Sequence, residues 1–172
     1  MSFKLGNTNI SELYVGNSKI AQAYLGSSLV YQISQPAADY DSYVIHLTWT
    51  SSGRTFNMAG LHINGVQATT SQVTSIMVYG NGHWDSESSS DIETAIKWDN
   101  NDNGYAMWGD AININFTSNS VLNKVEVKTG TWYGGNFMEV TMHVAGVKDG
   151  VETDLGYTSN TNDANLIYTV NI

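Results

Sequence analysis

The sequence contains no cysteine, a single proline and only seven Lys and Arg residues among 172 positions. The absence of cysteine excludes disulfides, thiolate zinc sites and cysteine nucleophiles. The formal net charge of −9 argues against nucleic acid and anionic membranes as partners, because both require a basic surface. No apolar run is close to the length of about 20 residues that a helix needs to span a bilayer. The opening MSFKLGNTNI also lacks the apolar core of a secretory signal peptide.

Catalytic motifs are also missing, since no G-x-S-x-G, H-E-x-x-H or phosphate-loop pattern occurs. The pairs Asp85/Glu87 and Asp91/Glu93 are of the kind that glycosidases use, but they lie in a Ser-rich loop, where solvated charge is the ordinary explanation. The four histidines have no ligand spacing and are expected to sit singly on strands and loops: His46, His62, His83 and His143. We therefore expect a protein that is not an enzyme.

What the sequence does contain is a ten-residue repeat, which begins at Leu5, Val15 and Leu25 and reads LGNTNISELY, VGNSKIAQAY and LGSSLVYQI. A period of ten with a glycine near the turn is too short for a helical repeat and fits one strand plus a turn. The recurring positions are the candidate attachment and oligomerisation residues: Leu5, Gly6, Ile10, Tyr14, Gly16, Ile20, Tyr24, Gly26 and Val30.

Such short units cannot bury their apolar residues alone, because an isolated two-stranded hairpin is marginal in water. They are expected to lie against another copy, another subunit or a larger particle. The alternative is a plain β-meander that opens one globular domain. The stretch ISELYVGNSKIAQAYLGSSLVY, from Ile10 to Tyr31, resembles the short repeats that open many virion proteins of tailed bacteriophages, including fibre and decoration proteins of cyanophages. This resemblance implies a virion component, most often a homotrimer, and supplies no catalytic residues.

The only proline, Pro36, lies in the polar stretch QISQPAADYDS, which is typical of a linker. We therefore expect an attachment region over residues 1–33, a linker over 34–42 and a folded domain over 43–172. Hydrophobic residues make up 41% of the chain, which is enough for a core in that domain.

Apolar residues alternate with polar ones in five segments of the expected domain, the period-two pattern of strands with unlike faces. These segments are 43–49, 112–116, 125–128, 138–144 and 166–172. Residues 76–79 form a further short strand, and Asn64-Gly65 is a strong hairpin turn. Ser90 and Glu93 form a capping-box pattern that predicts a short helix over 91–97.

Many short strands with little helix predict an all-β fold, a jelly-roll-like β-sandwich. The order of parts after Ala95, with Trp98, Trp108 and the strand Ile112–Phe116, resembles the discoidin-like, galactose-binding β-sandwich. Trp98 stands where that family has Phe and Asn100 where it has Gly, and the cysteine pair is missing, so the resemblance bears on the fold more than on a ligand.

The segment DNNDNG from Asp99 to Gly104 matches a calcium-loop pattern, with Asp110 at its twelfth position. Calcium prefers hard oxygen ligands, so this segment is a candidate Ca²⁺ site; an ordinary Asx-turn loop is the alternative. The candidate ligands are Asp99, Asn101, Asn103 and Asp110.

Two segments place aromatic residues among glycines: residues 80–85 with Trp84, and residues 130–136 with Trp132 and Tyr133. Flat rings beside Asn, Asp and His suit the C–H face and hydroxyls of a sugar. The alternatives are a lid over the sandwich or a subunit interface.

Together these features predict a structural protein of a phage particle, a short fibre or capsid-decorating knob, located in the virion. It would bind other capsid or tail proteins through its repeats and display a sandwich that contacts host-surface glycans. The alternative is a carbohydrate-binding module or adhesin tip that is not tied to a virion.

Overall fold

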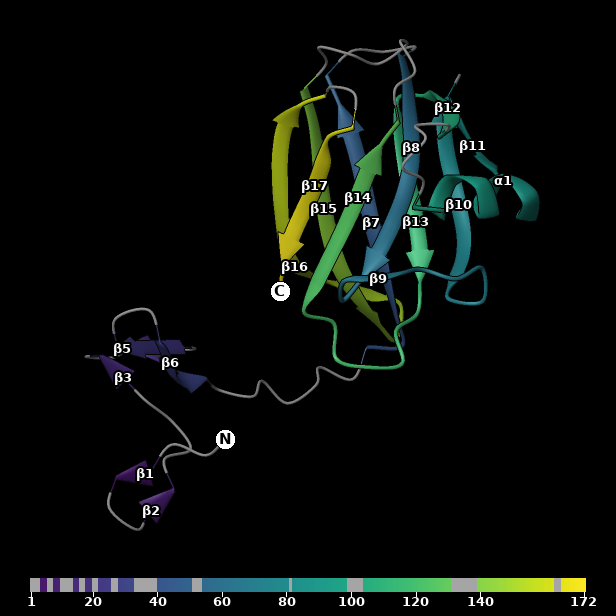
Figure 1. Cartoon of the computed structure of the whole chain (residues 1–172). Coiled ribbons are helices and arrows are strands. Elements are labelled where there is room, and N and C mark those ends of the chain that lie inside the picture. Colours follow the sequence, from purple (N-terminus) through teal and green to yellow (C-terminus); the bar gives the residue numbers. More distant parts are fainter. Residues whose placement is uncertain are drawn as a thin grey trace. The chain divides into compact units, whose positions relative to one another are not determined.

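The computed structural model describes six short strands within the first 32 residues, and then residues 40–50, 54–80, 82–98, 104–130, 139–162 and 165–172. The chain forms two compact units, Met1–Ala38 and Asp39–Ile172 (Figure 1). The boundary between them falls within the segment 34–42 that we expect to be a linker.

The first unit contains three β-hairpins, one for each ten-residue repeat. β1 (Lys4–Leu5) pairs with β2 (Thr8–Asn9), β3 (Tyr14–Val15) with β4 (Ser18–Lys19), and β5 (Gln22–Leu25) with β6 (Ser28–Gln32), all antiparallel. The first strand of each hairpin ends on the first residue of a repeat, at Leu5, Val15 and Leu25, and the second strand lies within that repeat. The ten-residue period therefore contains a hairpin rather than the single strand predicted.

Four of the predicted attachment residues lie on these strands: Leu5, Tyr14, Tyr24 and Val30. The other five lie outside the described residues: Gly6, Ile10, Gly16, Ile20 and Gly26.

The second unit is a sandwich of two antiparallel sheets, which confirms the all-β prediction (Figure 1). The six-stranded sheet has the order β11-β10-β13-β7-β15-β16, and the second sheet has the order β12-β8-β14-β17, with β9 paired to β8. The strands are β7 (Ser42–Trp49), β8 (Arg54–Ile63), β9 (Val66–Gln67), β10 (Val73–Gly80), β11 (His83–Ser86), β12 (Tyr105–Gly109), β13 (Ala111–Phe116), β14 (Lys124–Thr129), β15 (Glu139–Lys148), β16 (Val151–Thr161) and β17 (Ile167–Asn171).

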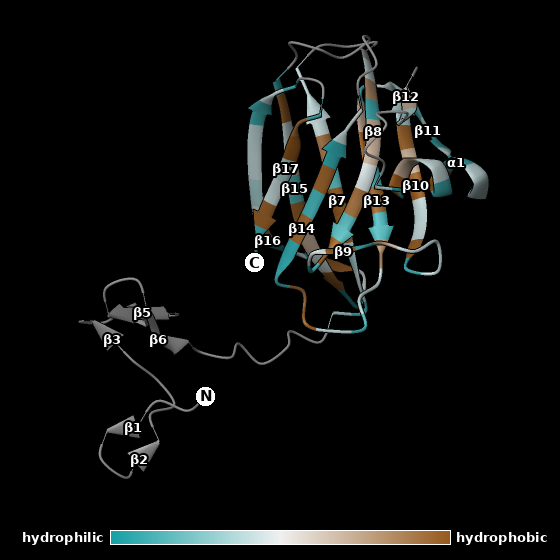
Figure 2. Cartoon of the chain, viewed as in Figure 1, coloured by the Kyte–Doolittle hydropathy of each residue, from teal (hydrophilic) through white to brown (hydrophobic). Residues whose placement is uncertain are grey.

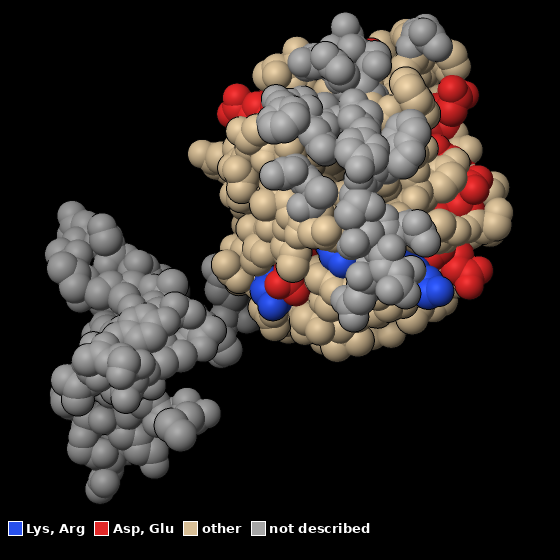
Figure 3. Space-filling view, turned by 45° about the horizontal axis from the view of Figure 1, so that its top comes forward, with Lys and Arg blue, Asp and Glu red and all other residues tan. Residues whose placement is uncertain are grey.

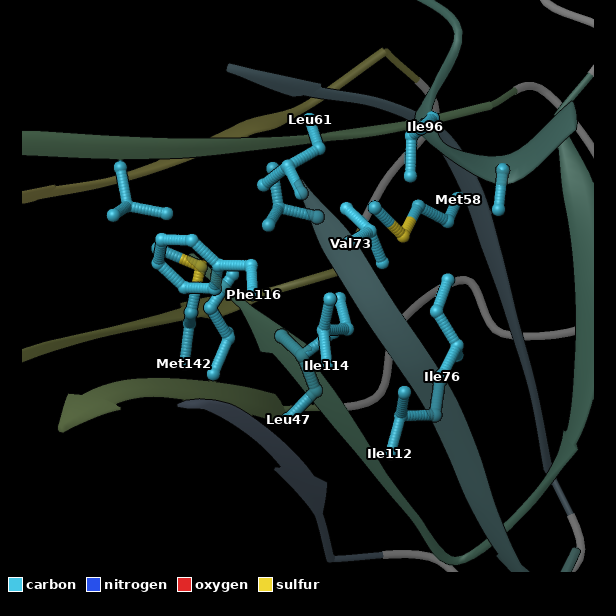
Figure 4. Close-up of a cluster of buried hydrophobic side chains, with 14 of the residues drawn as sticks. Leu47, Met58, Leu61, Val73, Ile76, Ile96, Ile112, Ile114, Phe116 and Met142 are labelled. Atoms are coloured by element: carbon cyan, nitrogen blue, oxygen red, sulfur yellow. The ribbon is translucent and has the colours of Figure 1, made fainter. Parts of the chain in front are cut away.

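The core forms where the apolar faces of the two sheets meet, as the hydropathy pattern along the strands indicates (Figure 2). Figure 4 shows side chains from both sheets pointing toward one another, among them Leu47 and Ile114 from the first and Met58 and Leu61 from the second. All four are fully buried. Each such side chain contributes about 1.5–3 kcal/mol through the removal of apolar surface from water. The alternation seen in the sequence thus sets which face of each strand is inside.

The turn after β8 is the hairpin that Asn64-Gly65 predicted. Both residues have positive φ, 54° and 79°, as a tight two-residue turn requires, and Ile63 pairs with Val66 across it.

The helix α1 (Ser89–Ile96) begins two residues earlier than predicted, with Ser88 rather than Ser90 as its N-cap. The Ser88 hydroxyl accepts a hydrogen bond from the Asp91 backbone N–H, so the capping pair is Ser88 and Asp91. Residues 88–90 are all serines, and both Ser88 and Ser90 are followed by an acidic residue three positions later. In the structure the N-cap is Ser88, the first of the two. The described part of the chain contains no helix long and apolar enough to cross a membrane.

Candidate functional site

The edges of the two sheets meet where β10 and β12 come together at a pair of glycines. A Cβ atom added to Gly80 would lie 3.5 Å from the Gly109 Cα, and one added to Gly109 would clash with the Tyr79 carbonyl oxygen. The Asp110 N–H donates a 2.6 Å hydrogen bond to that carbonyl. Backbone therefore packs directly on backbone, which only glycine at position 109 permits.

Beside this contact lies a cleft of about 250 Å³. Its lining residues come from β10, from β11 and the residue after it, and from β12: Val78, Gly80, Asp85, Glu87, Tyr105, Ala106 and Trp108. The cleft is thus built from three segments that the fold brings to one margin of the sandwich. We call it the β11–β12 cleft.

The aromatic wall of the β11–β12 cleft is Trp108. Its neighbour Met107 is 1% exposed and belongs to the core, so strand alternation turns Trp108 outward, where it is 65% exposed. The alternation of the segment YAMWG could have indicated an exposed Trp108, but the sequence resemblance uses this residue only for the fold. It is the most exposed tryptophan among the described residues.

The polar wall carries two carboxylates and a phenol. The Tyr105 hydroxyl donates a 2.8 Å hydrogen bond to Glu87 Oε2. Burial raises the pKa of Tyr105, and the hydrogen bond to Glu87 raises it further, so this hydroxyl stays protonated as a donor. The Asp85 carboxylate lies 2.8 Å from His83 Nε2, and both side chains are exposed. The Asp85/Glu87 pair therefore lines a cleft instead of lying in an open loop as expected.

Acidic groups dominate this margin of the molecule. Figure 3 shows acidic side chains along the side on which β11, β12 and α1 lie in Figure 1, with a basic group beside the lowest of them. Among the described residues, no Lys or Arg lines the β11–β12 cleft. An anionic ligand would therefore meet like charge.

Trp84 lies on strand β11, not on the loop predicted for it. It pairs with Tyr79 across the hairpin, and the two rings are tilted by 50° with centroids 5.1 Å apart. Alternation along β11 places Trp84 on the outer face of the sheet and its neighbour Asp85 toward the cleft. Trp84 is 43% exposed, so it remains available for contact. The other two predicted ligand residues, Trp132 and Tyr133, lie outside the described residues.

The predicted calcium loop is only partly described, since Asp99, Asn101 and Asn103 lie outside the described residues. The structure does place Asp110. Between Gly104 and Asp110 the chain runs as the extended strand β12. Six residue steps at about 3.3 Å each separate them by about 20 Å. Asp110 is therefore too far from Gly104 to share an ion with a residue next to that glycine. Within the described ranges, no group of three or more His, Asp or Glu side chains is placed to hold a metal ion.

The histidines do not all sit singly. His46 on β7 and His143 on β15 pair across the outer face of the six-stranded sheet, with stacked rings 5.8 Å apart. His46 Nε2 lies 3.0 Å from Glu152 Oε2, and His143 Nε2 lies 2.9 Å from Asp154 Oδ1. Sequence spacing did not reveal this pairing, because 97 residues separate positions 46 and 143 that the sheet makes neighbours.

The site that the described structure presents most clearly is therefore the β11–β12 cleft, with an exposed ring on one side and acceptor oxygens on the other. Comparison of the chain with protein-family models, with curated proteins and with solved structures finds no match.

Proposed function

We propose that the protein is a structural component of a phage particle, a short fibre or a capsid-decorating knob, which attaches through residues 1–33 and displays its sandwich outward. The observation that supports this proposal best is the series of three hairpins formed by the ten-residue repeat, in a unit of its own.

The hairpins lack partners of the kind that stabilise short strands. The first two have strands of only two residues each, and each of the three pairs only with itself among the described strands. Because a lone two-stranded hairpin is marginal in water, the unit needs further surface to be stable. A second and third copy of the chain, or the surface of a particle, would supply it.

The sandwich, in contrast, has its own core. Its two sheets enclose one cluster of buried side chains drawn from both sheets and from α1. All of these residues belong to the second unit, which suits a module displayed on a particle. The division of labour is then attachment by the first unit and contact with the surroundings by the second.

The alternative function is a carbohydrate-binding module or adhesin tip that is not tied to a virion. The β11–β12 cleft favours it, because an exposed Trp108 beside carboxylates is a chemistry suited to sugars. The two functions differ in what the repeats do: a free module has no need of an attachment unit.

Electron microscopy of purified phage particles tests the proposal. Gold-labelled antibodies against residues 43–172 should mark regular positions on the capsid, collar or tail. A variant that lacks residues 1–33 should be absent from particles, whereas Trp108→Ala, which leaves the repeats intact, should be incorporated normally. Unlabelled particles, with the protein only in the soluble fraction of the lysate, would refute a virion role.

A further inference from the structure

We infer that the β11–β12 cleft binds one residue of a neutral glycan, with Trp108 packed on a face of the sugar ring and Asp85 and Glu87 accepting hydrogen bonds from its hydroxyls. This inference rests on the proposed function for the source of the glycan, a host cell surface, and deepens it by assigning the ligand class and the contact residues. All the residues that line the cleft belong to the second unit, outside the repeats.

The size of the cleft sets the size of the ligand. Its volume of about 250 Å³ lies just below the range of about 300–1,000 Å³ found for drug-sized ligands. It therefore accommodates one sugar ring, while further residues of a chain would extend over the rim. Because both walls are edge strands, the cleft is open at the margin of the sandwich, and binding within a longer polymer is possible.

Trp108 provides the apolar contact. Its side chain is 65% exposed and lines the cleft, so part of the ring is accessible to a ligand. The C–H face of a pyranose is flat and weakly apolar, and an aromatic face is its natural counterpart. Since Trp108 follows the buried Met107 in an edge strand, its backbone position is fixed by the core and little ordering is required on binding.

The carboxylates provide the polar contact. A sugar hydroxyl that donates to a carboxylate makes a charge-assisted hydrogen bond, which is about twice as strong as a neutral one. Glu87 Oε2 is already held by the Tyr105 hydroxyl, which orients the carboxylate and leaves its other oxygen's lone pairs for a ligand. Asp85 lies on β11, with its carboxylate 2.8 Å from His83 Nε2. The Glu87 acceptor is thus oriented before a ligand arrives, and the exposed Asp85 carboxylate lies beside it in the cleft lining.

Charge decides among the possible ligands. Among the described lining residues the charged side chains are the acids Asp85 and Glu87, so a neutral sugar is favoured over sialylated, sulfated or phosphorylated ones. A quaternary ammonium group would be attracted by the same acids, but such a cation is best held between several ring faces. Here one strongly exposed ring lines the cleft, and the other aromatic residue, Tyr105, is tied to Glu87. The combination fits a neutral sugar best.

The test is titration calorimetry of the full chain with four probes: a panel of neutral hexose oligosaccharides, the same sugars as free monosaccharides, a sialylated oligosaccharide, and choline. We expect saturable binding of at least one neutral oligosaccharide, weaker binding of its terminal monosaccharide, and none of the sialylated sugar or choline. Absence of binding across the neutral panel, or preference for choline, would overturn the inference.

Variants locate the site. Trp108→Ala and Asp85→Asn should each weaken binding by roughly tenfold, which corresponds to about 1.4 kcal/mol. Tyr157→Ala is the matched control, because Tyr157 is 71% exposed on β16, the opposite edge strand of the same sheet, and should bind as the parent chain does. Unchanged binding in Trp108→Ala together with lost binding in Trp84→Ala would place the sugar on the outer face and refute the cleft.

Circular dichroism and the melting temperature show whether each variant keeps the fold. If Trp108→Ala does not fold, the binding affinity of Asp85→Asn still tests the cleft, because the Asp85 side chain is exposed and its replacement should not disturb folding. Failure of this inference is distinguishable from failure of the proposed function. Particles that carry the protein while no neutral sugar binds would contradict the cleft alone. Sugar binding by a protein that is absent from particles would contradict the virion role alone.

Discussion

The Tyr105 hydroxyl donates a 2.8 Å hydrogen bond to Glu87 Oε2, and this contact joins the edge strand of one sheet to the segment between β11 and α1 at the edge of the other. The two sheets of a sandwich are otherwise held together by apolar packing, which is non-directional. At this margin the Tyr105–Glu87 hydrogen bond adds a directional contact to the backbone hydrogen bond that the Asp110 N–H donates to the Tyr79 carbonyl oxygen. The width of the β11–β12 cleft depends on both.

Replacement of Tyr105 by Phe should lower the free energy of unfolding by about 1–2 kcal/mol, because one partner of a part-buried hydrogen bond is lost while the ring remains. Urea denaturation followed by circular dichroism measures this loss. Tyr157→Phe is the control, since Tyr157 is 71% exposed and should change stability by less than about 0.5 kcal/mol. Equal losses in the two variants would contradict a specific role for the Tyr105–Glu87 contact.

Alkaline pH should destabilise the sandwich through its buried tyrosines. Burial raises the pKa of Tyr168, which is 1% exposed, and burial together with Glu87 raises that of Tyr105. Because the folded state holds these protons more tightly than the unfolded state, their contribution is fully present below the unfolded pKa of about 10 and is lost as pH rises above it. Melting temperatures between pH 8 and 11 should fall at the upper end, and the fall should be smaller in Tyr168→Phe. A flat profile would contradict these shifts.

The strands that could be predicted from sequence are those that face the core. β7, β13, β14, β15 and β17 each contribute alternating buried side chains, and each was predicted from that alternation. β16 was not, although it has eleven residues, because it is an edge strand whose side chains are largely exposed and so carry no alternation. β11 escaped prediction for the same reason, since all four of its residues are exposed.

The β11–β12 cleft could not be derived from sequence because its walls belong to different sheets, although its lining residues all lie between Val78 and Trp108. Asp85 and Trp108 meet only through the positions of two edge strands in different sheets. The N-cap of α1, in contrast, depends on two residues that are close in sequence, Ser88 and Asp91. The start of this helix could therefore be predicted to within two residues. A cleft between sheet edges depends on the whole topology.

The repeats should make the chain an oligomer, most simply a trimer. The three hairpins pair only with themselves among the described strands, and such short hairpins need further contacts to be stable, which neighbouring copies would supply. Light scattering of the full chain should give a trimer, and a chain that starts at Ala37, outside the repeats, should give a monomer with the same sandwich signature by circular dichroism. A soluble, monodisperse monomer of the full chain would contradict this prediction.

If calcium binds to the segment that begins at Asp99, the chelator EDTA should lower the melting temperature and added Ca²⁺ should restore it, since a ligand of the native state stabilises it by mass action. The extended strand β12 supplies a sharp control. Asp99→Ala should abolish the calcium response, whereas Asp110→Ala should keep it, because about 20 Å of strand separates that residue from Gly104. A loss of the response in both variants would contradict the separation, and no chelator effect in the parent chain would contradict the site.

The residues Trp132 and Tyr133 should contribute to contact with host cells. They lie between β14 and β15, and Val140 at the start of β15 pairs with Trp49 at the end of β7. That segment therefore connects strands at the end of the sandwich opposite Ser42, where β7 begins. Loops gathered at one end of a sandwich form a common surface, and glycine-flanked aromatic residues there suit ligand contact.

The double variant Trp132→Ala/Tyr133→Ala should leave the melting temperature and the oligomeric state unchanged while it reduces adsorption of particles to host cells. Adsorption is measured by counting free particles after mixing with cells, and Tyr157→Ala on the exposed edge strand β16 is the control. Combination of the double variant with Trp108→Ala separates the two surfaces: the losses should add if the end of the sandwich and the β11–β12 cleft act independently. An unfolded double variant would show instead that these rings belong to the core, and the contact role would then pass to the cleft alone.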